Sequence, residues 1–372
     1  MKLRLGIIGT GESWATRHAP ALRMLHDRFD VRAVFSPTVR LAENIAAEFQ
    51  ADVVDGYQCL VRRCDIDAVL VLEKTWLGWL PLVAAARAGK AIYFAGDCDI
   101  DPVSDQSLCD EIERSGVSMM VEFPLRYAPA TLRLKELIAT RLGPVQLVFC
   151  HNRQTREQDL QRHRASARGE ILQRIDWCNY LVGRPPIDVN SSGHHRDDGG
   201  RDYRCLSLRY AAEPTPGGIA NGTSGQLGGT GQLGGTGQLG GTGQNGHPEN
   251  ARVGPPVMGP HVEISFGSFF PPHWSDAMNY QTPSALQVCC ENGMAFVDPP
   301  SSLVWFDEAG RHRESLESET PVGQRLLCQF HRSVTSLLRN VGDLDDAFSA
   351  AGALRAADDS EARGVRMPIE RP

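Results

Sequence analysis

An apolar run at the start of the chain, Leu3 to Ile8, stops at a Gly-Thr-Gly turn, and residues 15–25 then have the pattern of a helix. This order predicts a strand, a tight turn and a helix, whose backbone N–H groups suit a dinucleotide pyrophosphate. Because Trp14 replaces the third glycine of the usual G-x-G-x-x-G pattern, a glycine-rich turn that binds nothing is the alternative. The candidate cofactor-binding residues here are Gly9, Thr10, Gly11, Glu12, Ser13 and Trp14.

The next hundred residues alternate between apolar runs and helical patterns. We expect strands at 31–35, 67–72, 91–94 and 117–121. The expected helices are 39–49, 80–88 and a third that begins after Asp101, as N-cap, and ends at Gly116. This alternation predicts an α/β fold, a Rossmann-type, doubly wound parallel sheet.

The residue that ends the second strand bears on the choice of cofactor. An acidic residue there would accept a hydrogen bond from the 2′-hydroxyl of the adenosine ribose and repel a 2′-phosphate. This chain has Ser36, with Arg40 four residues later. NAD and NADP both stay open, and the pair mildly favours NADP. Arg40 is equally well explained as a solvated residue of its helix.

The second half of the chain has a different pattern. Period-two alternation at 205–210, 262–266, 286–290 and 304–306 predicts a C-terminal α+β domain with an open, mostly antiparallel sheet. We place the domains at 1–122 and 123–372. Within the second, residues 223–260 contain the repeat Gly-Gln-Leu-Gly-Gly-Thr, which is too rich in glycine to build a core and predicts a surface excursion.

Composition limits the partners and the compartment. The net charge is −7 without a basic cluster, which argues against nucleic acid, and no apolar run is long enough to span a membrane. Ten scattered cysteines without CxxC pairs are typical of reduced thiols. The expected first strand leaves no room for a signal peptide. We therefore expect a cytoplasmic protein that binds a small molecule.

The order of these elements resembles the Gfo/Idh/MocA family of NAD(P)-dependent sugar and polyol oxidoreductases. The resemblance covers most of the chain outside roughly 212–260. The segments that carry it are 6–22, 41–49, 65–90, 116–138, 143–148, 175–183, 293–296 and a helix from about Gln324. It implies an NAD(P) cofactor, a sugar, polyol or related alcohol as substrate, and a homo-oligomer formed through one face of the C-terminal sheet.

The residues that would carry the family's chemistry differ in this chain. The lysine of the family's Glu-Lys-Pro triplet falls on Gly96, and its Thr-Pro turn falls on Glu73-Lys74. The Asp and the His of the second-domain helix fall on Gly169 and Gln173. Glutamine cannot take up and release a proton near neutral pH, so the usual acid–base pair is missing.

Three other polar groups are candidates. Asp97, Asp99 and Asp101 alternate as metal ligands would, but Asp101 is already explained as a helix cap, and we expect no metal. The sequence 194–198, His-His-Arg-Asp-Asp, is expected to be a solvated loop. Arg126 either binds a substrate hydroxyl or carboxylate, or braces the domain junction through ion pairs.

Two functional hypotheses follow. In the first, the chain is an oxidoreductase in which the glycine turn holds the cofactor, Arg126, Gln173 and Asp176 line the substrate cleft, and the catalytic residue is unknown. In the second, it is a non-catalytic dinucleotide- or sugar-binding subunit, a pseudoenzyme on the same fold.

Overall fold

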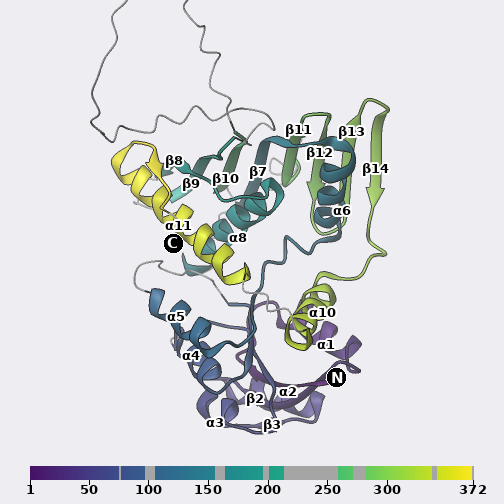
Figure 1. Cartoon of the computed structure of the whole chain (residues 1–372), viewed down its shortest axis with the longest axis vertical. Coiled ribbons are helices and arrows are strands. Elements are labelled where there is room, and N and C mark those ends of the chain that lie inside the picture. Colours follow the sequence, from purple (N-terminus) through teal and green to yellow (C-terminus); the bar gives the residue numbers. More distant parts are fainter. Residues whose placement is uncertain are drawn as a thin grey trace, which may run out of the picture.

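The N-terminal part of the computed structural model is a six-stranded, all-parallel sheet (Figure 1). The structure describes residues 1–74, 77–96, 105–155, 164–195, 201–212, 259–270, 282–336 and 342–370. The strands are β1 (Leu3–Ile8), β2 (Phe29–Phe35), β3 (Asp52–Val53), β4 (Ala68–Val71), β5 (Ala91–Phe94) and β6 (Met119–Val121). Their order, β3-β2-β1-β4-β5-β6, confirms the predicted doubly wound fold.

The helices of this part are η1 (Trp14–His18), α1 (Ala19–Met24), α2 (Val39–Phe49), α3 (Tyr57–Val61), α4 (Leu80–Arg87) and α5 (Gln106–Ser115). They include those that the sequence pattern predicted, with differences near residues 15–25 and at the start of α5, and α3 was not expected. The single helix expected at 15–25 is divided into a π-helical turn and α1. Helix α5 follows Asp105, and the expected cap Asp101 lies outside the described residues.

The second part is a nine-stranded sheet in the order β14-β13-β12-β11-β7-β10-β9-β8-β15. Its strands are β7 (Val145–Thr155), β8 (Asp188–His195), β9 (Arg201–Arg209), β10 (His261–Phe270), β11 (Leu286–Cys290), β12 (Gly293–Asp298), β13 (Ser302–Asp307), β14 (Gly310–Ser315) and β15 (Met367–Pro368). Among the described strands, β7 and β10 form the one parallel pair, which confirms the predicted mostly antiparallel sheet.

Helices cover one face of this second sheet (Figure 1). They are α6 (Pro129–Leu137), α8 (Arg164–Val182) and α11 (Gly342–Arg363), and the π-helical turn η2 (Ile138–Leu142) continues α6. The inward side chains of the strands, such as Val148, Ile264 and Val288, are fully buried against them. The expected α+β arrangement follows, because each strand places alternate residues on the helix-covered face.

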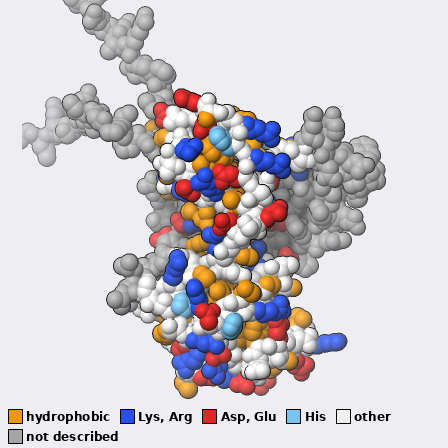
Figure 2. All heavy atoms as spheres, turned by 90° about the vertical axis from the view of Figure 1, so that its right-hand side faces the viewer, with side chains coloured by type: hydrophobic (Ala, Val, Ile, Leu, Met, Phe, Trp, Pro, Cys, Tyr) orange, Lys and Arg blue, Asp and Glu red, His pale blue; other side chains and the backbone are white. Residues whose placement is uncertain are grey.

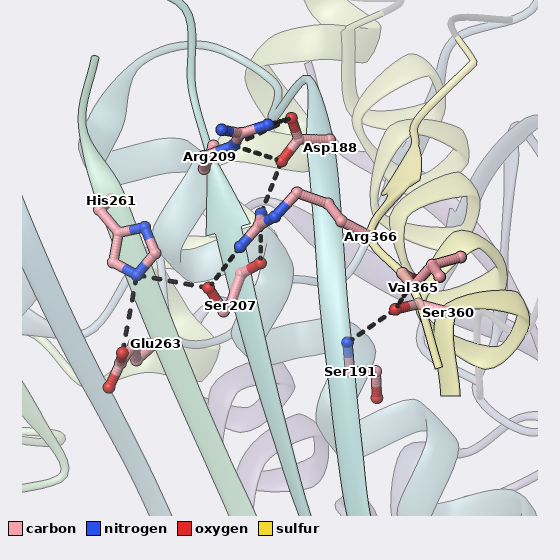
Figure 3. Close-up of polar contacts among 9 residues, drawn as sticks. All are labelled: Asp188, Ser191, Ser207, Arg209, His261, Glu263, Ser360, Val365 and Arg366. Carbon is pink, nitrogen blue, oxygen red and sulfur yellow. Dashed lines mark hydrogen bonds and ion pairs between the residues drawn. The ribbon is translucent and has the colours of Figure 1, made fainter. Parts of the chain in front are cut away.

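The end of the chain is tied to the edge of this sheet through polar contacts (Figure 3). Arg366 donates to Asp188 Oδ1 at 2.6 Å and to Ser207 Oγ at 3.1 Å. Ser360 Oγ accepts the backbone N–H of Ser191 at 3.0 Å. These contacts bring β15 alongside β8, so the C-terminal segment completes the sheet.

One helix from the second half of the chain packs on the first sheet. Helix α10 (Val322–Thr335) lies beside α1 (Figure 1), and its Leu326, Leu327 and Phe330 are fully buried in the core that also contains Leu5 and Tyr93. The division at 122/123 stays a prediction, and α10 crosses back over it. Helix α10 also contacts η1, so the packing of η1 depends on a helix about 300 residues later in the chain.

The surface and the insertion add two observations. On the face shown in Figure 2, Lys and Arg side chains are interspersed with Asp and Glu over both parts of the molecule. Within the described residues, no helix is both long and apolar enough to cross a membrane. Of the surface excursion expected at 223–260, residues 223–258, which contain the glycine-rich repeat, lie outside the described residues. Pro260, at its end, is buried instead, and its carbonyl oxygen accepts the backbone N–H of Tyr210 at 3.0 Å.

Candidate functional site

The Gly-Thr-Gly turn follows β1 at the carboxyl edge of the parallel sheet. Gly9 and Gly11 have φ angles of +74° and +59°, a region that disfavours other residues. A β-carbon on Gly11 would lie 2.2 Å from the backbone oxygen of Leu72, at the end of β4. The turn is thus pressed against the neighbouring strand, and only glycine fits there.

The turn forms one wall of a cavity of about 540 Å³, called the central cavity below. Thr10, Gly11, Glu12 and Ser13 line it, and their N–H groups donate to no other backbone group in the described part of the chain. Four consecutive N–H donors beside a cavity at a strand edge fit the phosphates of a dinucleotide.

The replacement of the third glycine by Trp14 has a local explanation. The Trp14 ring packs edge-on against Phe49 of α2, with 6.0 Å between ring centroids. The side chain thus packs against the core of the first sheet, and Trp14 is the first residue of the π-helical turn η1. Residues 10–13 line the central cavity, whereas Trp14 is not among the described residues that line it.

Two residues were expected to influence the choice between NAD and NADP: Ser36, directly after β2, and Arg40, in α2. Ser36 is buried, and its Oγ accepts the N–H of Thr38 at 3.2 Å. Arg40 is exposed in the first turn of α2. Ser36 thus has a structural role in its own turn, and the choice between NAD and NADP stays a prediction.

The other walls of the central cavity come from both sheets. Glu73 and Lys74 follow β4, and Ala95 and Gly96 follow β5. Helix α8 of the second part contributes Gly169, Glu170 and Gln173. The structure therefore brings Gln173 to the cavity beside the glycine turn, as expected of a substrate-cleft residue.

Gly96 is required by its surroundings. A β-carbon on it would lie 2.7 Å from the backbone nitrogen of Lys74 and 2.8 Å from Cε2 of Phe94. The segment after β4 occupies the space of a side chain at position 96. A lysine could not be placed at 96 without moving Lys74.

Sequence reasoning missed a buried polar cluster in the floor of the central cavity. Glu122, which follows β6, accepts Nε2–H of His18 at 2.6 Å and the Tyr93 hydroxyl at 2.6 Å. Its other oxygen accepts the Arg17 guanidinium. The cluster joins η1, β5 and the end of β6, and no sequence spacing links its members. An acidic residue directly after an apolar strand was the only available signal.

Burial determines the charge state of His18. The residue is 2% exposed, and burial together with the Arg17 guanidinium lowers the pKa of its imidazole to about 3. The neutral ring then donates Nε2–H to the Glu122 carboxylate. This cluster holds η1 against the end of β6 and fixes the lower wall of the central cavity.

Arg126 and Asp176 are placed elsewhere. Arg126 Nε donates to Asp176 at 2.7 Å, and Nη1 donates to Asp346 of α11 at 2.7 Å. Burial opposes the charge of Arg126, but the carboxylates of Asp176 and Asp346 outweigh it and raise its pKa. Asp176 is 1% exposed, and Arg126 lines a separate cavity of about 590 Å³. Neither is among the described residues that line the central cavity, which favours the bracing role of Arg126.

The other candidates do not join the site. Asp97, Asp99, Asp101 and residues 196–198 lie outside the described residues. His194 and His195 end strand β8 rather than lying in a loop, and they pair separately with Asp202 and Glu361. In the described residues, no three His, Cys, Asp or Glu side chains are grouped to hold a metal ion.

Residues 3–94 match the family model described as "Oxidoreductase family, NAD-binding Rossmann fold", GFO_IDH_MocA. The chain is 26% identical over 198 residues to inositol 2-dehydrogenase of Rhizobium meliloti, covering 52% of this chain and 58% of that protein. The chain spans 58–64% of the length of the inositol 2-dehydrogenases that it matches.

Two solved structures share the fold over nearly the whole chain. The aldose-aldose oxidoreductase of Caulobacter crescentus, complexed with glycerol, has a TM-score of 0.73 at 13% identity, covering 99% of this chain and 100% of its own. An NAD binding oxidoreductase of Klebsiella pneumoniae has a TM-score of 0.72 at 15% identity, with both chains fully covered.

Proposed function

We propose that this chain, whose residues 3–94 match the GFO_IDH_MocA oxidoreductase model, is an NAD(P)-dependent oxidoreductase of that family acting on a sugar, polyol or related alcohol. The observation that carries this proposal is the central cavity. It is bordered on one side by the glycine turn and on the other by α8 of the second part. A cavity between a dinucleotide-type turn and a second domain is a common arrangement for a cofactor and its substrate.

The residues of the cavity have distinct roles in this proposal. The N–H groups of Thr10 to Ser13 bind the phosphates, and a bound nicotinamide dinucleotide supplies the hydride acceptor or donor. The Gln173 amide donates to and accepts from substrate hydroxyls. The Arg17 guanidinium, held by Glu122, offers further donors at the floor. Such polar lining suits a molecule with several hydroxyl groups, and the inositol 2-dehydrogenases among the relatives support this class.

We propose NADP as the preferred cofactor. Ser36 carries no charge to repel a 2′-phosphate, and the exposed Arg40 is on the helix that follows it. Fluorescence titration of NADH and NADPH tests this preference. Arg40→Ala is expected to weaken NADPH binding and to leave NADH binding unchanged.

A second candidate function is a non-catalytic dinucleotide- or sugar-binding subunit. The observation that favours it is the absence of an ionisable side chain at Gly96 and Gln173. Titration with both dinucleotides, followed by absorbance assays on inositols and aldoses, separates the two. Binding without turnover favours the second function, and failure to bind either dinucleotide overturns both.

The proposal includes a cytoplasmic homo-oligomer. The nine cysteines in the described part of the chain are all free thiols, which supports a reducing compartment. The face of the second sheet opposite its helices has an apolar row across four strands, made by Leu147, Cys289, Met294 and Phe306. Leu147 and Phe306 are 39% and 37% exposed. Light scattering is expected to show an oligomer that Phe306→Glu dissociates.

A further inference from the structure

Lysine is rare in this chain. Only four of the 38 basic residues are lysines. Lys90 and Lys135 each donate to two backbone carbonyl oxygens, and Lys2 is exposed near the start of the chain. Lys74 is the lysine that lines the central cavity. A chain that uses arginine almost everywhere thus has, at this position, the cation that can lose its proton.

The side chain of Lys74 is held in place at the carboxyl edge of the sheet. Its Nζ lies 3.7 Å from the centroid of the Trp79 ring, and that ring packs against Phe94 at 5.4 Å between centroids. The backbone nitrogen of Lys74 lies against Gly96, at the end of β5. Lys74 is half-buried and lines the central cavity, so its side chain is positioned at the wall of that cavity.

The buried groups of the cavity are poorly suited to exchange a proton with a substrate. Glu122 is buried and already accepts three side-chain donors. His18 is 2% exposed, so a substrate hydroxyl cannot reach its Nδ1, although that atom has no partner among the described residues.

The more accessible groups are limited by their chemistry or their partners. Arg17 stays protonated at any working pH, and the Gln173 amide does not titrate. Glu170 accepts Asn152 Nδ2 at 2.8 Å and pairs with Arg174. Among the described residues, the remaining charged groups that line the cavity are Glu12, Glu73 and Lys74. Of these three, Lys74 is the one that an aromatic ring holds at a defined position.

We propose that Lys74 Nζ exchanges the proton with the reacting hydroxyl of the substrate. This inference rests on the proposed oxidoreductase function. In the oxidation direction, the O–H bond breaks and an N–H bond forms on the neutral amine. The electron pair of that O–H bond becomes the second carbon–oxygen bond as the carbon loses a hydride to the oxidised nicotinamide. The alcohol is oxidised, the nicotinamide is reduced, and the ammonium group then releases one proton to water.

The kinetic test compares Lys74→Met and Lys74→Arg with the matched control Lys2→Met, using NADP or NAD and a panel of inositols and aldoses. Lys74→Met removes the group that exchanges the proton and is expected to lower kcat by roughly 100- to 10,000-fold. Lys74→Arg is expected to be equally slow, because arginine keeps its proton. NADH and NADPH affinities are expected to stay within about twofold.

A second readout needs no turnover. Reductive methylation with ¹³C-formaldehyde labels four lysines, and the Lys74 signal is identified by its loss in Lys74→Arg. Addition of inositol to the NADH-bound protein is expected to shift the Lys74 signal and to leave the Lys2 signal unmoved.

The outcomes separate this inference from the proposed function. Turnover by Lys74→Met at the wild-type rate, or loss of dinucleotide affinity with unchanged kcat, overturns the assignment of Lys74 and leaves the oxidoreductase function standing. Dinucleotide binding without turnover across the panel overturns the Lys74 assignment and favours the non-catalytic function. Failure of the wild type to bind either dinucleotide overturns both.

Discussion

The backbone nitrogen of Lys74 lies 2.7 Å from the position that a β-carbon on Gly96 would occupy. The backbone that follows β4 and the Phe94 ring therefore fill the space that a side chain at position 96 would need. The Lys74 side chain itself lies over the Trp79 ring. This relationship accounts for Gly96 by packing alone.

Gly96→Ala is expected to lower the free energy of unfolding by roughly 1–3 kcal/mol, because the added carbon overlaps the Lys74 backbone and the Phe94 ring. Thermal unfolding measures this change. Gly56→Ala is the matched control, since a β-carbon there meets nothing within 4 Å. Gly96→Lys is expected to be no more active than the wild type. Equal stability of the two alanine variants would contradict the packing explanation.

Gly11→Ala is expected to destabilise the protein and to lower dinucleotide affinity at least tenfold. Its φ of +59° costs an alanine roughly 1–2 kcal/mol, and the overlap with the Leu72 carbonyl adds to that. Gly78→Ala separates the two causes, because Gly78 has a φ of +57° and open space around it. Unfolding and fluorescence titration would measure both variants. If Gly78→Ala weakens dinucleotide binding as much as Gly11→Ala does, the loss of affinity does not come from the glycine turn.

Asp176→Asn is expected to cost roughly 3–5 kcal/mol of stability, because it leaves the buried Arg126 without its main counter-charge. Asp346→Asn removes a partner whose side chain is 49% exposed and is expected to cost about 0–1 kcal/mol. Both variants should bind NADH and NADPH like the wild type. If Asp176→Asn stays stable but loses substrate affinity, then Asp176 belongs to the substrate cleft.

Stability is expected to fall as the pH drops from about 6.5 toward 3. The pKa of His18 is about 3 in the folded protein and near 6.5 in an exposed histidine, so the unfolded chain binds more protons in this window. The stability that comes from neutral His18 is complete above pH 6.5. His18→Gln keeps a donor for Glu122 and should flatten the pH dependence, measured by urea unfolding. His26→Gln, at an exposed histidine, is the control and should follow the wild type.

Local patterns predicted most of the first sheet and its helices. Helix α2 and strand β5 were expected at 39–49 and 91–94, and the structure has the same bounds. Gly116 ends α5 in the left-handed conformation that the sequence suggested. Such features depend on a few neighbouring residues, such as an apolar run or a glycine that can adopt a positive φ.

The candidate site depended far more on contacts between distant residues. The roles of Arg126 and Asp176 could not be read from their spacing, because Arg126 also pairs with Asp346, which is 220 positions away. The His18–Glu122 contact joins residues 104 positions apart, and neither residue had been singled out. Gln173 was the substrate-cleft candidate that the structure brought to the glycine turn.

The sequence by itself determined the doubly wound sheet, the glycine turn that follows β1 and the mostly antiparallel second sheet. Apolar periodicity and glycine conformation act within a few residues, so they are visible in the chain. Only the tertiary structure decided that the Lys74 backbone lies against Gly96, that Glu122 holds His18 and Arg17, and that α10 packs on the first core. These contacts depend on where the strand ends meet, and packing of the whole chain sets that position.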